Sequence, residues 1–149
     1  MRISDCGLRI DMTTPVTREV LQRRTRTLAV DAIRLIGDLP RTLPADVIGR
    51  QLVRSATSVA ANYRSACRAR SRRDFIAKMG IVEEETDETA FWLELLDECR
   101  LVPTTRIMPL SREAGELLAI TVASIRTARM GSGASRANPQ STIRNPQCS

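Results

Sequence analysis

The chain contains no histidine, and only 3% of its 149 residues are aromatic. The absence of histidine removes the usual general base, the commonest metal ligand and the Glu-x-x-His pairs of di-iron bundles. A core with so few rings must be filled by aliphatic side chains, which is typical of packed helices. No stretch approaches the roughly 18 consecutive apolar residues of a membrane-spanning helix. These shortages favour an all-α protein and disfavour most enzymes.

Cysteines are few, and their spacing does not match a metal site. The four are Cys6, Cys67, Cys99 and Cys148. We expect reduced, inert thiols, with Cys67 and Cys99 at helical positions compatible with burial. Residues 1–14 lack the apolar core of a signal peptide, so we expect a cytoplasmic protein. The sequence has no histidine base to activate a serine, and it has no Gly-rich loop to bind phosphate. We therefore expect no enzymatic activity and no cofactor.

Apolar side chains recur at helical spacing in four segments, and no segment of strand length alternates. Pro40 and Pro103 interrupt the pattern, and Leu43-Pro44 suits a helix start. Ser71 is a good N-cap, with Asp74 at the third position inside the next helix. We expect an antiparallel up-down-up-down four-helix bundle. Its predicted helices cover residues 17–39, 43–69, 72–100 and 105–129.

The ends of the chain differ in composition from this helical region. We expect a flexible leader over residues 1–16, the bundle over 17–130 and a disordered tail over 131–149. The tail is rich in Gly, Ser and Asn and repeats Asn-Pro-Gln. Met12 is an alternative natural start to Met1. Residues 17–129 hold 19 basic and 15 acidic residues, so the bundle itself is basic.

The third predicted helix carries two apolar stripes about 100° apart. The second contains Trp92 together with Glu85 and Glu88, which are three residues apart. Two stripes indicate burial against two surfaces, its own bundle and a neighbouring subunit. Half-buried carboxylates need a positively charged partner. We expect arginines to fill this role, and not a hard metal cation bound by Glu85 and Glu88 together with Glu84. No metal is therefore expected.

Arginine dominates the basic residues, with 22 of 23, and it concentrates where acids are missing. No acidic residue lies between residues 50 and 73. The first four arginines of this interval fall on one line along a helix, and the others follow at the corner before the third helix. The set is Arg50, Arg54, Arg64, Arg68, Arg70, Arg72 and Arg73.

An unpaired array of guanidinium groups along one edge suits nucleic acid backbone, RNA or DNA, with little sequence preference. Tyr63, the aromatic residue nearest these arginines, points inward by its stripe and is not available for base stacking. Two alternatives stay open at this point. In the first, the arginines are only a solvent-exposed helix face without a binding role. In the second, the protein is an interaction scaffold in which the arginines pair with Glu85 and Glu88 at subunit interfaces.

Three motifs together resemble one protein family. They are R-S-x-x-S-x-x-x-N at residues 54–62, S-R-x-D-F at 71–75 and E-x-x-E-T-x-x-W-L-E-L-L at 85–96. Over about residues 17–129 the chain resembles the four-helix-bundle proteins named from intervening sequences in 23S rRNA genes. The motif positions matched here are Asn62, Arg64, Ser71, Phe75, Glu85, Glu88 and Trp92. Arg64-Ser65-Ala66 departs from the Ala-Glu-Gly of many members, as expected of a divergent branch.

The resemblance implies properties that the spacing of residues does not. Members of this family are cytoplasmic bundles that assemble as homopentameric rings, with no assigned enzymatic activity. Relatives include the accessory variability determinant proteins of diversity-generating retroelements, whose basic barrels bind nucleic acid and a reverse transcriptase. The resemblance thus implies that the chain's partners are copies of itself, RNA or DNA, and a reverse transcriptase or another protein. It also implies an interface or structural role for Asn62, Glu85, Glu88 and Trp92.

Overall fold

Four α-helices make up the computed structural model over residues 16–131, the part of the chain that it describes. They are α1 (Arg18–Ile36), α2 (Leu43–Ala66), α3 (Arg72–Glu98) and α4 (Thr104–Met130). No residue in this range forms a strand, so the all-α prediction is confirmed. None of the four helices has an apolar stretch long enough to cross a bilayer. The predicted leader and tail lie outside the described residues except for Val16 and Gly131, and Cys6, Met12 and Cys148 lie outside them too.

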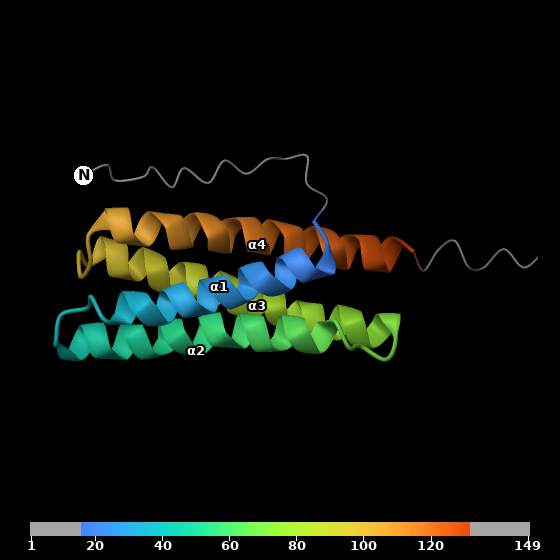
Figure 1. Ribbon diagram of the computed structural model, residues 1–149, viewed down its shortest axis with the longest axis horizontal. Coiled ribbons are helices and arrows are strands. Elements are labelled where there is room, and N and C mark those ends of the chain that lie inside the picture. Colours follow the sequence, from blue (N-terminus) through green and yellow to red (C-terminus); the bar gives the residue numbers. More distant parts are fainter. Residues whose placement is uncertain (1–15, 132–149) are drawn as a thin grey trace, which may run out of the picture.

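The helices lie side by side along one axis, joined by short connections at alternate ends. In the view of Figure 1, α2 and α4 run from left to right, and α1 and α3 run from right to left. Helix α2 packs most extensively on α3, while the contact of α1 with α4 is smaller than those of α1 with α2 and of α3 with α4. The α2–α3 connection therefore lies at the same end of the bundle as the beginning of α1 and the end of α4.

Aliphatic stripes from all four helices meet in one core. Tyr63 also points inward, as its stripe predicts, with 6% of its surface exposed. Buried threonine hydroxyls bond to carbonyl groups of their own helix, as Thr86 does to Val82 at 2.6 Å. No buried side-chain polar atom of the described residues lacks a partner. The core includes Leu28, Ala32, Leu35, Leu52, Ala56, Val59, Met79, Val82, Leu93, Leu96, Ala114, Leu117 and Ile125.

The second stripe of α3 is only partly covered within one chain. Leu95 and Trp92 pack at the edge of the core, whereas Ile81 is 42% exposed. Cys99, for which we expected burial, is exposed, because it follows the last turn of α3. Cys67 is half-buried, and both thiols are free.

Three helices end earlier than the sequence pattern predicts. Helix α1 ends at Ile36 because the chain tightens into successive turns, with Asp38 N–H bonded to Leu35 O at 3.0 Å. The residue before a proline disfavours the α conformation, so Leu39 cannot continue the helix into Pro40. Helix α2 ends at Ala66 and not at Ala69, since a similar turn joins Arg68 N–H to Ser65 O.

Helix α3 ends at Glu98 in a Schellman motif. The N–H of Leu101 donates to Leu96 O at 3.1 Å, and the N–H of Arg100 donates to Asp97 O at 2.9 Å. The motif requires a left-handed residue just after the helix, a position that glycine usually occupies. Arg100 occupies it here with φ of 51°. An arginine in this conformation crowds its Cβ against its own backbone.

Replacing Arg100 with glycine should therefore stabilise the protein. We expect Arg100→Gly to raise the free energy of unfolding by about 0.5–1 kcal/mol, measured by urea denaturation. The same substitution at the exposed Arg112, inside α4, should lower it by about 1 kcal/mol, because glycine disfavours a helix interior. Loss of stability in both variants would contradict this account of the α3 terminus.

Candidate nucleic-acid interface

The corner between α2 and α3 is held by backbone capping. Ser71 is the N-cap of α3, as predicted, and its hydroxyl oxygen accepts the N–H of Asp74 at 3.1 Å. In return the Asp74 carboxylate accepts the N–H of Arg70 at 3.0 Å and pairs with Lys78 at 2.9 Å. The Arg70 N–H, and then Lys78, lower the pKa of Asp74 from its ordinary value. This reciprocal capping fixes the backbone that carries Arg70, Arg72 and Arg73.

All seven arginines that the sequence singled out are exposed, but they do not form one unpaired array. That expectation is wrong for two of them. Arg50 pairs with Asp46, one turn earlier on α2, at 3.0 Å. Arg54 pairs with carboxylates of α3. The other five have no ion pair among residues 16–131: Arg64, Arg68, Arg70, Arg72 and Arg73.

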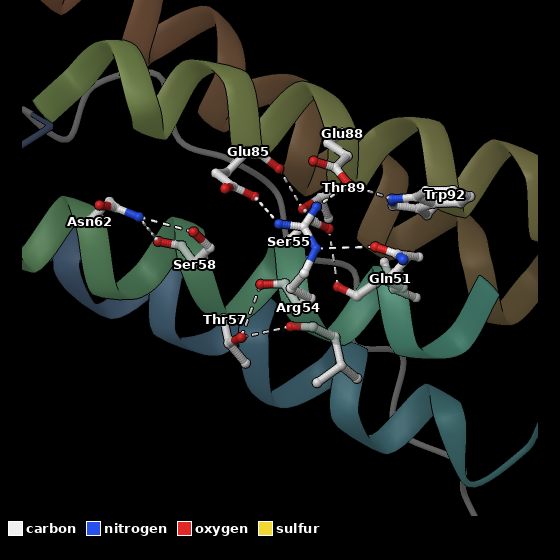
Figure 2. Close-up of polar contacts among 12 residues, drawn as sticks. Gln51, Arg54, Ser55, Thr57, Ser58, Asn62, Glu85, Glu88, Thr89 and Trp92 are labelled. Atoms are coloured by element: carbon white, nitrogen blue, oxygen red, sulfur yellow. Dashed lines mark hydrogen bonds and ion pairs between the residues drawn. The ribbon is translucent and has the colours of Figure 1, made fainter. Parts of the chain in front are cut away.

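Arg54 bridges α2 and α3 through a network of side chains (Figure 2). Its guanidinium pairs with Glu88 and lies 3.5 Å from Glu85 Oε2. The oxygen that pairs with Arg54, Glu88 Oε1, also accepts the indole N–H of Trp92 at 3.0 Å. The Arg54 Nε–H donates to Gln51 Oε1 at 3.1 Å. Glu85 and Glu88 therefore have an arginine partner within a single chain.

These contacts shift the acidity of the groups in the network. The bond from Arg54, followed by the bond from Trp92, lowers the pKa of Glu88 below its ordinary value of 4.5. Glu88 in turn is the main cause that raises the pKa of Arg54. Both side chains stay charged at neutral pH, so the pair is a permanent electrostatic link between the two helices.

A buried hydroxyl pair lies beside this network, and sequence reasoning missed it. Ser55 on α2 and Thr89 on α3 are both fully buried, and their hydroxyl oxygens are 3.0 Å apart. The Ser55 hydroxyl donates to Leu52 O at 3.2 Å. The single proton of Thr89 goes either to Ser55 Oγ or to Glu85 O, 2.7 Å away. The available signal was their position: both fall on the core stripes of their helices.

Asn62 does not join the arginine–glutamate network. Its amide Nδ2 donates to the backbone oxygen and to the hydroxyl oxygen of Ser58, each at 2.9 Å, on its own helix (Figure 2). Asn62 is half-buried on α2 and has no contact of this kind with Glu85 or Glu88. Trp92, by contrast, is tied to Glu88.

Other helices contribute to the same end of the bundle as the α2–α3 corner. Arg72 lies against the end of α4, because a Cβ atom added to Gly131 would meet its guanidinium at 3.1 Å. Arg18, at the beginning of α1, lies close enough to Tyr63 to act on its pKa, which burial raises. Arg126 and Arg129 are exposed on the last turns of α4. Sequence reasoning missed Arg18, Arg126 and Arg129 because it followed only α2 and the corner that leads into α3.

Away from this end, carboxylates neutralise further arginines between helices. Arg24 on α1 binds Glu113 at 2.7 Å and Glu116 at 2.7 Å, both on α4. Arg106 on α4 pairs with Asp38 in the connection between α1 and α2. Over residues 16–131 no group of three or more potential metal-binding side chains comes together. The geometry at Glu85 and Glu88 is that of an ion pair with Arg54.

Comparison with known proteins decides the family. Residues 19–123 match the model of the 23S rRNA-intervening sequence protein family. The chain belongs to this family. A search of curated proteins finds no match. The resemblance drawn from the three motifs is thus confirmed at the level of the family.

A solved structure supports the same conclusion. It is a protein of unknown function from the S23 ribosomal protein family of Bacteroides thetaiotaomicron, 30% identical to this chain. The similarity covers 73% of this chain and 97% of that one, with a TM-score of 0.68. The 23S rRNA-intervening sequence protein family thus provides the fold, and the function has to be argued from the surface.

The network predicts a specific response of Glu88 to the loss of Arg54. In Arg54→Met the pKa of Glu88, measured by carboxyl NMR titration, should rise toward 4.5, because the main cause of its lowering is gone. A carboxyl group with a lowered pKa stabilises the fold fully above 4.5 and less as pH falls through the lowered value. The variant should therefore lose less stability on acidification than the wild type.

Arg50→Met is the matched control, since Arg50 lies one turn from Arg54 but pairs with Asp46. It should leave the titration of Glu88 unchanged. An unaltered Glu88 titration in Arg54→Met would show that the ion pair does not exist in solution.

Proposed function

We propose that this protein is a non-catalytic, oligomeric helical bundle that binds the backbone of RNA or DNA. The observation that carries the proposal is the set of five exposed arginines at the α2–α3 corner without an ion pair among the described residues. They are Arg64, Arg68, Arg70, Arg72 and Arg73. Arg50 and Arg54 are neutralised by carboxylates, so they are not part of the proposed binding surface.

The chemistry of these side chains fits phosphate. A guanidinium group is always charged and presents a planar fork of donors that matches phosphate oxygens. Contacts of this kind fix position and affinity but do not read base sequence. The reciprocal capping by Ser71 and Asp74 holds the corner in place, so little ordering is needed on binding.

The proposal includes assembly. We propose that the chain forms an up-down-up-down bundle and that five copies form a ring in the cytoplasm. A relation to accessory variability determinant proteins would make a reverse transcriptase a partner. Membership of the family supports the assembly, and so does the second stripe of α3, where Ile81 is 42% exposed. Phe91, elsewhere on the same helix, is 50% exposed.

The alternative is a protein-interaction scaffold without nucleic acid. The exposed apolar side chains of α3 favour an interface of some kind. The version in which arginines hold subunits together through Glu85 and Glu88 has less support, because Arg54 of the same chain already pairs with both. The two functions therefore differ in whether the unpaired arginines bind phosphate.

Reversing two of these charges distinguishes the functions. We expect Arg64→Glu combined with Arg68→Glu to abolish binding of a labelled nucleic acid in fluorescence anisotropy. For the wild type, raising the salt concentration should weaken binding steeply, since each neutralised phosphate releases counterions. If the variant retains some binding, a plot of its log binding constant against log salt concentration should have a slope smaller in magnitude by about two than that of the wild type.

The control variant combines Arg41→Glu with Arg112→Glu. Both arginines are exposed and have no ion pair among the described residues, and both lie outside the α2–α3 corner. The same change of charge there should reduce affinity far less. If the Arg64 and Arg68 variant bound nucleic acid as tightly as the wild type, the proposed function would be refuted. The protein-interaction scaffold would then remain as the alternative.

A further inference from the structure

Charge is unevenly distributed along the bundle. The segments at the α2–α3 end, residues 16–22, 60–79 and 120–131, hold nine basic and two acidic residues. The rest of the described chain, residues 23–59 and 80–119, holds ten basic and thirteen acidic residues. We call the first set of segments the basic end. Its formal charge is +7, against −3 for the remainder.

All four helices contribute to the basic end. Figure 1 shows the start of α1, the α2–α3 connection and the last turns of α4 together at the right. The contact of Arg72 with the Gly131 position links α3 to α4 there. The nine basic residues are Arg18, Arg64, Arg68, Arg70, Arg72, Arg73, Lys78, Arg126 and Arg129.

Within residues 16–131, no carboxylate from outside the basic end forms an ion pair with it. Within the described part of the basic end, the one ion pair joins Lys78 to Asp74. Residues 1–15 and 132–149 contain four arginines and only two acids, Asp5 and Asp11. Apart from Asp74, the acids of α3 begin at Glu83, one turn beyond the basic end.

The cations cover an area and not a groove. Packed helices lie about 8–10 Å apart, so four helix ends with their arginines span roughly 20 Å or more in two directions. The hollows lined by Leu39, Leu43 and Val53 and by Asp97 and Pro103 lie at the opposite end of the bundle. A double helix presents phosphates of two strands over such an area, with twice the charge per length of one strand.

Aromatic side chains are not available for base stacking at the basic end. Tyr63 is buried, and Phe75 packs against the core. Phe91 and Trp92 lie on the acid-rich part of α3, where their rings pack edge to face with ring centres 4.8 Å apart. Proteins that hold single strands use aromatic rings as stacking platforms. A surface of guanidinium groups without rings fits stacked, paired bases whose phosphates face outward.

We propose that the basic end binds double-stranded nucleic acid, RNA or DNA, in preference to a single strand. This inference rests on the proposed function and specifies its ligand. It also enlarges the binding surface beyond the α2–α3 corner, to Arg18 on α1 and Arg129 on α4. The acid-rich remainder of the bundle repels the same phosphates, so the duplex contacts the end of the bundle and not its flank.

The test measures anisotropy of four labelled probes with the full-length protein at one salt concentration. They are a mixed-sequence duplex of about 20 base pairs in RNA, the same duplex in DNA, and one unstructured strand of each. Both duplexes should bind at least about tenfold tighter than their single strands. Arg18→Glu combined with Arg129→Glu should weaken duplex binding by at least about tenfold, and Arg41→Glu with Arg112→Glu should weaken it far less.

Each outcome decides a different statement. Equal or tighter binding of the single strands overturns the duplex preference but leaves backbone binding in place. Unchanged duplex affinity of the Arg18 and Arg129 variant, with its helical circular dichroism intact, overturns the enlarged surface. Failure of the wild type to bind any of the probes overturns the proposed function as well.

Discussion

The register of α2 against α3 decides which arginines are neutralised and which are not. Arg54 faces Glu85 and Glu88, and one residue later Ser55 meets Thr89 in the core. Because the two helices run in opposite directions, the last turns of α2, which carry Arg64, lie opposite earlier residues of α3. There α3 offers Lys78 and no glutamate. The uneven charge of the bundle follows from this alignment.

Local signals in the sequence predicted much of the fold. The Ser71 cap, the proline at the start of α2 and the inward position of Tyr63 depend on neighbours within a few residues, which a single segment shows. The end of α3 was less visible, because its Schellman motif uses Arg100 where glycine is the usual signal.

The site was harder to predict than the fold, for physical reasons. A helical wheel places Arg54 on a face but does not show which α3 residues lie opposite, since that depends on the register between helices. The ion pair of Arg50 with Asp46 was predictable, because the two residues are four positions apart on one helix. It was missed because Asp46 lies just before the acid-free interval that begins at residue 50. Arg18 and Arg129 are 111 positions apart in the sequence, and only the assembled bundle brings them to one end.

The central claim is that phosphate binds where the fold leaves arginines without carboxylates. Amide hydrogen exchange, read by mass spectrometry with and without duplex, tests it most directly because it locates the contact surface along the chain. The account predicts slower exchange at the α2–α3 connection and the last turns of α4, with residues 83–98 unchanged. Protection confined to residues 83–98, or to the connection between α1 and α2, would contradict it.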